Sequence, residues 1–173
     1  MVTGHTAVFE RTLRTSAIWL DELARELDCI AASRPGGAGS RAAAPAARVV
    51  AKDEKKAYVA LRATLHALRD RLPLPEVIQL GAQLPLLLRG AFYDGWRPTG
   101  KPLKIRRREQ FLALVREHMG NGAAISPERA VRGVFRLLSA RVSAGEIDDV
   151  IDSLPRDIAD LWFEDSRYTE RDD

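Results

Sequence analysis

The chain has 173 residues and a net charge of +3, and its 46% hydrophobic and 29% charged residues are typical of one globular domain or two small ones. No apolar run approaches the about 20 residues that span a bilayer and no secretory signal is recognisable, so we expect no membrane segment. One cysteine, Cys29, and three histidines argue against an internal disulfide or a Cys/His metal site, and they favour a reducing, cytoplasmic compartment.

Apolar residues recur at helical spacing through most of the sequence, and no stretch alternates with the period of a strand, so we predict an all-α protein. Residues 31–48 interrupt this pattern with Ala, Gly, Pro, Ser and Arg only. They offer no large side chain to bury, which predicts a flexible insertion that tolerates shortening. The predicted helices cover residues 6–28, 53–71, 75–83, 85–94, about 105–118, 127–141, a segment after Ser143, and 155–164.

Local signals mark several helix starts. Pro85 and Pro155 each open a short helix, and Ser126 precedes a proline as an N-cap does. Ser143 and Glu146 match a capping box, in which each side chain bonds the other residue's backbone.

The sequence is similar to itself at an offset of 70 residues. Residues 60–93 align with residues 130–163 without a gap, and a Leu-Pro step recurs at the same helix boundary in both copies. The identical pairs are Ala60/Ala130, Arg62/Arg132, Leu68/Leu138, Arg71/Arg141, Glu76/Glu146, Leu84/Leu154 and Pro85/Pro155.

This repeat predicts two similar four-helix modules packed into one compact domain. Residues 1–94 form the first module, with the flexible insertion at 31–48. Residues 95–104 form a basic connecting loop, and residues 105–173 form the second module with a polar tail.

Charge is unevenly distributed along the chain. Residues 89–108 hold seven basic side chains and one acid, whereas residues 145–173 hold eleven acids and three arginines. This separation favours an acidic partner or self-association through opposite poles, and it also fits two solvated faces that contact nothing.

The basic stretch provides the candidate partner-binding residues. Arginine presents forked donors suited to phosphate or carboxylate, and an aromatic ring can stack on a base. Cations at the start of a helix oppose its dipole, which suggests that the charge is needed. The alternative is structural: the tryptophan packs between the modules and the arginines pair with acids near Asp148, Asp149 and Asp157. The candidates are Trp96, Arg97, Lys101, Lys104, Arg106, Arg107 and Arg108.

No catalytic, cofactor-binding or metal-binding residues emerge from the sequence. His66 has Asp70 one turn later, but no nucleophile accompanies them, so a surface or boundary histidine is the favoured interpretation. The glycine-rich residues 36–41 lack the Gly-Lys-Ser/Thr ending of a phosphate loop.

Three phrases carry a resemblance to a known family: ALRATLHALRDRLP, LGAQLPLLLRGAFYDGWRPTGKP and RAVRGVFRLLSARVSAGEIDDVIDSLP. With these, the chain resembles the bacterial domain-of-unknown-function family numbered 2267 over about residues 6–28 and 53–164. The resemblance implies small, helical, cytoplasmic proteins without an established activity, with a weak association with stress.

Together these observations predict a non-enzymatic cytoplasmic interaction or regulatory protein that needs no cofactor. A protein partner or self-association is the favoured expectation. The alternative is a nucleic-acid or ribosome-associated binder that uses residues 97–108.

Overall fold

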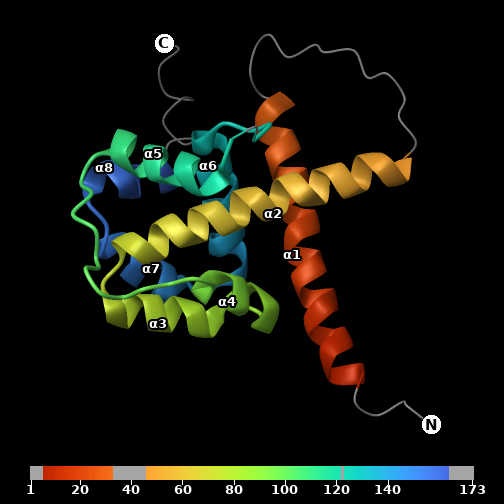
Figure 1. Cartoon of the computed structure of the whole chain (residues 1–173), viewed down its shortest axis with the longest axis horizontal. Coiled ribbons are helices and arrows are strands. Elements are labelled where there is room, and N and C mark those ends of the chain that lie inside the picture. Colours follow the sequence, from red (N-terminus) through yellow and green to blue (C-terminus); the bar gives the residue numbers. More distant parts are fainter. Residues whose placement is uncertain (1–5, 33–45, 122, 164–173) are drawn as a thin grey trace.

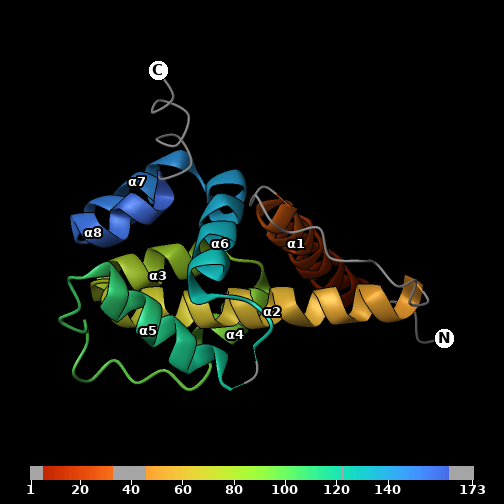
Figure 2. The ribbon, with the colours of Figure 1, turned by 90° about the horizontal axis from the view of Figure 1, so that it is seen from above.

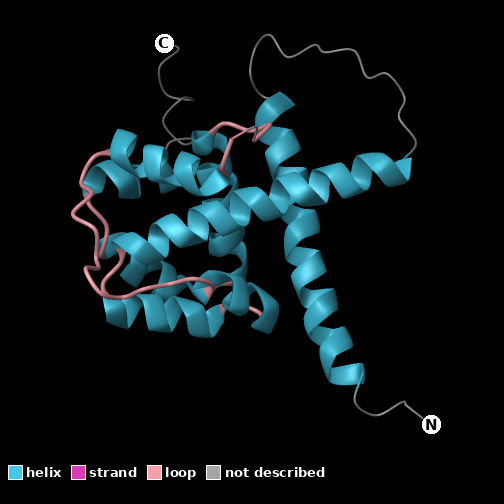
Figure 3. Ribbon diagram, in the orientation of Figure 1, coloured by secondary structure: helices cyan, strands magenta, loops and turns pink. Residues whose placement is uncertain are grey.

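The computed structural model describes residues 6–32, 46–121 and 123–163. Within these ranges the chain forms helices joined by loops and no strand, so the predicted all-α class is confirmed (Figure 3). The helices are α1 (Thr6–Ala32), α2 (Ala46–Arg71), α3 (Leu74–Gln83), α4 (Leu86–Tyr93), α5 (Arg108–Met119), α6 (Pro127–Arg141), α7 (Ala144–Asp152), α8 (Arg156–Ala159) and the 3₁₀ helix η1 (Asp160–Trp162).

The C-terminal half of α2 is the centre of the molecule. All residues from 63 to 70 are buried, because α1, α4, α5 and α6 all pack against this helix (Figures 1 and 2). A helix that is covered on every side must pair any polar side chain it carries, since water cannot reach it.

Helix α1 crosses α2 and projects beyond the other helices at its N-terminal end (Figure 1). Trp19, Leu23 and Leu27 are buried in the core where α1 meets α2 and α6. Phe9 and Leu13 continue the same helical spacing of apolar residues, but their side chains lie on the projecting half of α1 and are 62% and 57% exposed.

Side chains satisfy several helix ends. The Ser126 hydroxyl accepts a hydrogen bond from the Arg129 amide at 3.3 Å, so the predicted N-cap of α6 is confirmed. Arg89 donates to the carbonyl oxygens of Gly81 and Ala82 at 2.8 and 2.9 Å. These carbonyls lie at the end of α3, where no later helical turn supplies a donor.

Other helix ends differ from the prediction. Helix α1 extends to Ala32 and α2 begins at Ala46, so both ends of the predicted insertion are helical, as the high helix propensity of alanine favours. The rest of that insertion lies outside the described residues. Helix α5 begins at Arg108 rather than near 105, because Gln110 Oε1 accepts from the amide of Arg107 at 3.3 Å and fixes the helix start there.

The predicted capping box of α7 is wrong. Ser143 is the N-cap residue, but its side chain makes no capping hydrogen bond. Glu146 is buried instead, and its Oε1 atom has no hydrogen-bond partner. Ser143 and Glu146 therefore do not form the reciprocal pair of hydrogen bonds that a capping box requires.

Three helix boundaries follow the offset of 70 residues, but the ends of the short helices do not: α4 runs to Tyr93, whereas α8 ends at Ala159 and continues as η1. Helices α2 and α6 end at Arg71 and Arg141, α3 and α7 begin at Leu74 and Ala144, and α4 and α8 begin at Leu86 and Arg156. The three-dimensional superposition of the two modules stays a prediction.

Candidate functional site

The basic segment, residues 94–108, runs past the C-terminal end of α2 and is fixed to it (Figure 1). The Leu103 amide donates to the Asp70 carbonyl oxygen at 2.8 Å. Arg71 Nε donates to the Ile105 carbonyl oxygen at 2.7 Å, and Arg69 donates to the Asp94 carbonyl oxygen at 3.0 Å. The segment therefore has a defined path although it contains no helix before Arg108.

A buried ion cluster centred on Asp70 anchors this path. Asp70 Oδ1 lies 3.3 Å from Arg69 Nε, and Oδ2 lies 2.9 Å from Lys101 Nζ. Arg69 also donates to the Phe92 carbonyl oxygen at 2.5 Å. A buried charge is tolerated when it is paired and hydrogen-bonded. Lys101 is therefore engaged with the Asp70 carboxylate inside the protein.

Two histidines lie beside this cluster. His66 is buried, which corrects the expected surface or boundary position, and its Nε2 donates to the Ala91 carbonyl oxygen at 2.7 Å. Burial, opposed by this hydrogen bond and assisted by nearby arginines, lowers the pKa of His66 to about 4. Burial also lowers the pKa of His118. The His118 ring meets the His66 ring edge-on, with centroids 5.5 Å apart. Both rings are therefore neutral at pH 7. Within the described residues neither ring hydrogen-bonds a hydroxyl group that it could activate as a nucleophile.

Two further cations of the segment pair with acids. Arg107 Nη1 lies 3.6 Å from a carboxylate oxygen of Asp157 on α8, and Arg108 Nη2 lies 2.8 Å from Glu128 on α6. The pair with Asp157 fits the structural alternative, in which the arginines face acidic C-terminal helices. The Arg107 side chain is 74% exposed, so this pair is solvated and contributes little stability.

Trp96 is half-buried and packs against the core. Its ring centroid lies 5.8 Å from that of Tyr93, and its indole Nε1 is buried without a hydrogen-bond partner. The ring is thus engaged within the protein rather than presented as a platform for a base.

The remaining cations are solvent-exposed: Arg97, Lys104 and Arg106. Arg106 is joined by Arg71, which belongs to the sequence repeat but was not among the predicted partner-binding residues. Burial first, and the positive charge of Arg106 second, lower the pKa of Arg71, so the two guanidinium groups interact as like charges. We call Arg71, Lys104 and Arg106 the basic edge. The sequence signals for Arg71 were its position in the last turn of a predicted helix and its match to Arg141 in the repeat, and neither indicates a contact with the basic segment.

The comparison with known families agrees with the resemblance seen in the sequence. The family model described as "uncharacterized conserved protein (DUF2267)" matches residues 42–161. The chain belongs to the DUF2267 family. The DUF2267 match takes in α2 to α8 but not α1, whereas the sequence resemblance also included residues 6–28. A search of curated proteins found no match.

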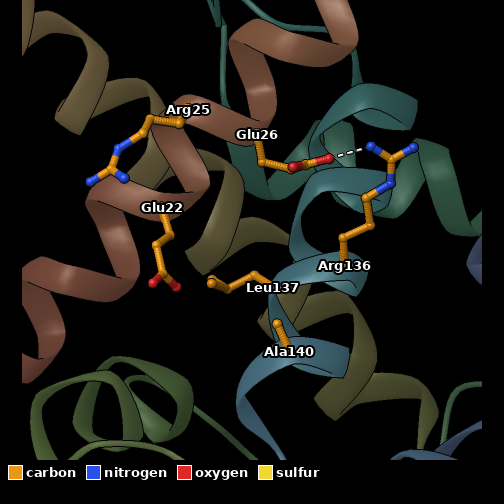
Figure 4. Close-up of a pocket in the computed structure, with 6 residues that line it drawn as sticks. All are labelled: Glu22, Arg25, Glu26, Arg136, Leu137 and Ala140. Carbon is orange, nitrogen blue, oxygen red and sulfur yellow. Dashed lines mark hydrogen bonds and ion pairs between the residues drawn. The ribbon is translucent and has the colours of Figure 1, made fainter.

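Outside the basic segment, this DUF2267 protein has a shallow hollow between α1 and α6 (Figure 4). Its charged side chains are already engaged: Glu26 pairs with Arg136, Glu22 accepts from Arg141 Nε at 2.7 Å, and Arg25 pairs with Asp21. The hollow therefore joins two helices and offers no spare charge to a ligand. Its lining residues are Glu22, Arg25, Glu26, Arg136, Leu137 and Ala140.

Metal-binding clusters and membrane spans are both missing from the described part of this DUF2267 protein. Residues 6–32, 46–121 and 123–163 contain no group of three or more His, Cys, Asp or Glu side chains that could hold a metal ion. In the same ranges, no helix combines the length and the apolar character needed to cross a membrane.

Proposed function

We propose that this chain is a non-enzymatic binding protein of the bacterial cytoplasm that binds an acidic partner protein on the basic edge. The single cysteine fits a reducing compartment. A stress-associated role would rest on the family resemblance alone.

One observation supports the basic edge above the other cations of the segment. The backbone that carries Lys104 and Arg106 is held to α2 through Asp70 and Arg71, but within the described residues Arg71, Lys104 and Arg106 form no ion pair with an acid. A fixed backbone reduces the entropy that is lost on binding, so unpaired charges on it form a preorganised surface. Such a surface selects a partner with the opposite charge.

Nucleic-acid binding is the alternative function, and the geometry favours it less. It would use the whole segment 97–108, but Lys101, Arg107 and Arg108 have acidic partners within the protein. Trp96, which would stack on a base, packs on Tyr93. Single-strand binders combine a continuous basic groove with exposed aromatic rings, and this segment offers neither.

The test is affinity capture from the native cell with the lysate divided into nuclease-treated and untreated halves. The Lys104→Gln/Arg106→Gln variant removes two charges from the basic edge. The matched control, Lys55→Gln/Arg116→Gln, removes two exposed charges from α2 and α5, away from this edge.

The proposal expects a protein partner that survives nuclease, is retained by the control, and is captured at least tenfold less by the basic-edge variant. The reduction follows from the loss of charge-assisted hydrogen bonds of about 1.5–3 kcal/mol each. Loss of all captured partners after nuclease treatment would support nucleic-acid binding instead. A partner that both variants capture as well as the wild type does would show that the binding surface lies elsewhere.

A further inference from the structure

Two guanidinium groups of the basic edge are held together without a carboxylate. Arg71 is the last residue of α2, and its Nε donates to the Ile105 carbonyl oxygen at 2.7 Å. Arg106 directly follows Ile105 in the chain, so this hydrogen bond holds the Arg71 side chain against the backbone next to Arg106. Arg71 is half-buried and Arg106 is exposed, and neither forms an ion pair in the described part of the chain.

This arrangement differs from the rest of the basic segment. Lys101, Arg107 and Arg108 each lie within 4 Å of a carboxylate, which compensates their charge. Arg71 and Arg106 instead repel each other, and Lys104 adds a third positive charge nearby in the sequence. The N-terminus of α5 begins at Arg108 and adds the positive end of a helix dipole. Neighbouring like charges are stabilised when an anion binds between them.

We infer that the basic edge is a binding site for a phosphomonoester dianion, with Arg71 and Arg106 as the two guanidinium donors. This inference rests on the proposed function, and it assigns the phosphate to the partner protein, as a phosphorylated side chain.

The donor set favours this ligand. Arg71 uses Nε for Ile105, which leaves its terminal N–H groups for an oxyanion, and Arg106 contributes a complete guanidinium fork. Guanidinium forks match the oxygen pairs of a phosphate, and the charge of two arginines balances the −1.5 to −2 charge of a phosphomonoester at pH 7. Nucleic acid carries one charge on each phosphodiester and needs a row of cations, but Lys101, Arg107 and Arg108 are already paired with carboxylates.

The experiment measures binding by calorimetry with the full chain. Its probes are a short peptide of glycine and alanine with one phosphoserine, the same peptide without phosphate, inorganic phosphate, and a single-stranded oligonucleotide. The variants are Arg106→Gln, the more conservative Arg71→Lys, and the Lys55→Gln/Arg116→Gln control. Circular dichroism verifies that each variant is folded.

The expected result is that the phosphopeptide binds at least tenfold more tightly than both the unphosphorylated peptide and inorganic phosphate. Arg106→Gln lowers this affinity at least tenfold and Arg71→Lys lowers it severalfold, because lysine keeps the charge but loses the fork. The affinity also falls below about pH 6, where the phosphomonoester becomes a monoanion. The control variant binds as the wild type does.

Several results would overturn the inference. They are equal binding of the two peptides, equal binding of inorganic phosphate and phosphopeptide, preference for the oligonucleotide, or loss of binding in the control variant. A captured partner that depends on Lys104 and Arg106 but still binds after phosphatase treatment would also overturn it, while leaving the proposed function intact.

Discussion

The C-terminal half of α2, the central helix, carries three ionisable side chains that are buried in the folded protein. His66, Arg69 and Asp70 lie within the fully buried stretch of α2, and each has a partner on another part of the chain or beside it. The sequence pattern placed His66 at the surface or its boundary because a polar residue on an amphipathic helix ordinarily faces water. That rule fails where neighbours cover the helix on every side, and the position of those neighbours is not a local property of the sequence.

The depressed pKa of His66 predicts a loss of stability in acid. Its folded-state pKa of about 4 lies below the value of 6.5 expected when unfolded, so the unfolded chain binds the proton first and stability falls as the pH drops through this window. The expected contribution is about 3 kcal/mol between pH 7 and pH 4. His118, with a pKa also lowered, acts in the same direction.

Urea unfolding at pH 7 and pH 4.5 measures this effect. In the His66→Gln variant, the side-chain amide can still donate to the Ala91 carbonyl but does not titrate, so its stability should depend less on pH than that of the wild type. Equal pH dependence in both proteins would contradict the prediction. The charged and titratable groups near His66 are the guanidinium groups of Arg62 and Arg69 on α2 and the imidazole of His118 on α5.

The Glu146→Gln variant should be more stable than the wild type at pH 7. Burial, followed by the charges of Glu76 and Asp149, raises the pKa of Glu146, so its ionisation costs stability as the pH rises through the folded-state pKa. Glu76 Oε2 is likewise buried without a hydrogen-bond partner. We expect a gain of about 1 kcal/mol at pH 7, the low end of the cost of an unsatisfied buried group.

Thermal unfolding should show that this gain shrinks towards pH 4.5, where the carboxyl group of the wild type becomes neutral. Asp148→Asn, an exposed change on the same helix, serves as the control and should have no comparable effect. A loss of stability in Glu146→Gln would mean that the ionised carboxylate is stabilised by the fold.

At the scale of the elements, helix boundaries were predictable where a side chain or a proline acts locally. Ser126 caps α6, and Pro85 and Pro155 precede α4 and α8, because these effects depend on neighbouring residues only. The capping box at Ser143 failed because α3 packs against α7 and Glu146 is buried there. The residues at positions 143 and 146 match the capping-box pattern, but tertiary packing places the Glu146 side chain in the interior instead.

Asp70 should be essential for the attachment of the basic segment. Asp70→Asn leaves Arg69 and Lys101 without a carboxylate, and breaking a buried ion pair costs about 3 kcal/mol or more. For a chain of this size we expect a melting temperature about 6–12 °C lower. Amide exchange at Leu103, which bonds the Asp70 carbonyl, should also become faster. Asp148→Asn is again the control, and an unchanged melting temperature in Asp70→Asn would refute the anchoring role.

Two glycine substitutions should have opposite effects. A Cβ atom at Gly133 would lie 2.7 Å from Leu27 Cδ2 and 3.2 Å from Leu23 Cδ1, so Gly133→Ala requires these buried side chains to shift and should cost about 1 kcal/mol or more. Gly90 lies in α4, and a Cβ atom added there would have no other atom within 4 Å, so Gly90→Ala should gain about 0.5–1 kcal/mol from helix propensity. Chemical denaturation of both variants tests the pair. Unchanged or raised stability of Gly133→Ala would contradict the close α1–α6 contact, and destabilisation by Gly90→Ala would contradict the open space at that position.

For the whole molecule, α1 is part of the core although the DUF2267 match begins after it. Trp19, Leu23 and Leu27 are at most 4% exposed, and Arg129 donates from α6 to the Leu27 carbonyl oxygen. The sequence showed an amphipathic helix here. It did not show that only the C-terminal half of the stripe meets the other helices, because that depends on where α1 crosses them.

A chain that begins at residue 42 should therefore lose its cooperative fold. Burial of each large apolar side chain contributes about 1.5–3 kcal/mol, so losing three approaches the whole stability of a typical domain of about 5–15 kcal/mol. We expect a state with helical circular dichroism that binds the dye ANS. A peptide of residues 6–32 added in trans should restore cooperative unfolding. A sharp, unassisted thermal transition would show that α1 is dispensable.

The sequence predicted which residues of the candidate site are charged, but not which of these charges stay unpaired on the surface of the folded protein. The density of arginine and lysine between residues 96 and 108 is visible in the sequence. Which cations pair inside the protein depends on Asp70, Asp157 and Glu128, which lie on three different helices. Arg71 was missed for the same reason, because its contact with Ile105 spans 34 residues.

The pairing of α1 with α6 also has a consequence for the synthesis of the chain. Arg129 meets Leu27 across 102 residues, and Arg141 meets Glu22 across 119. At about 5–20 residues per second, a ribosome needs about 5–20 s to make the segment between such partners. During that interval the apolar side of the nascent first helix has no α6 to cover it. The first helix can complete its packing only after the sixth helix has been made.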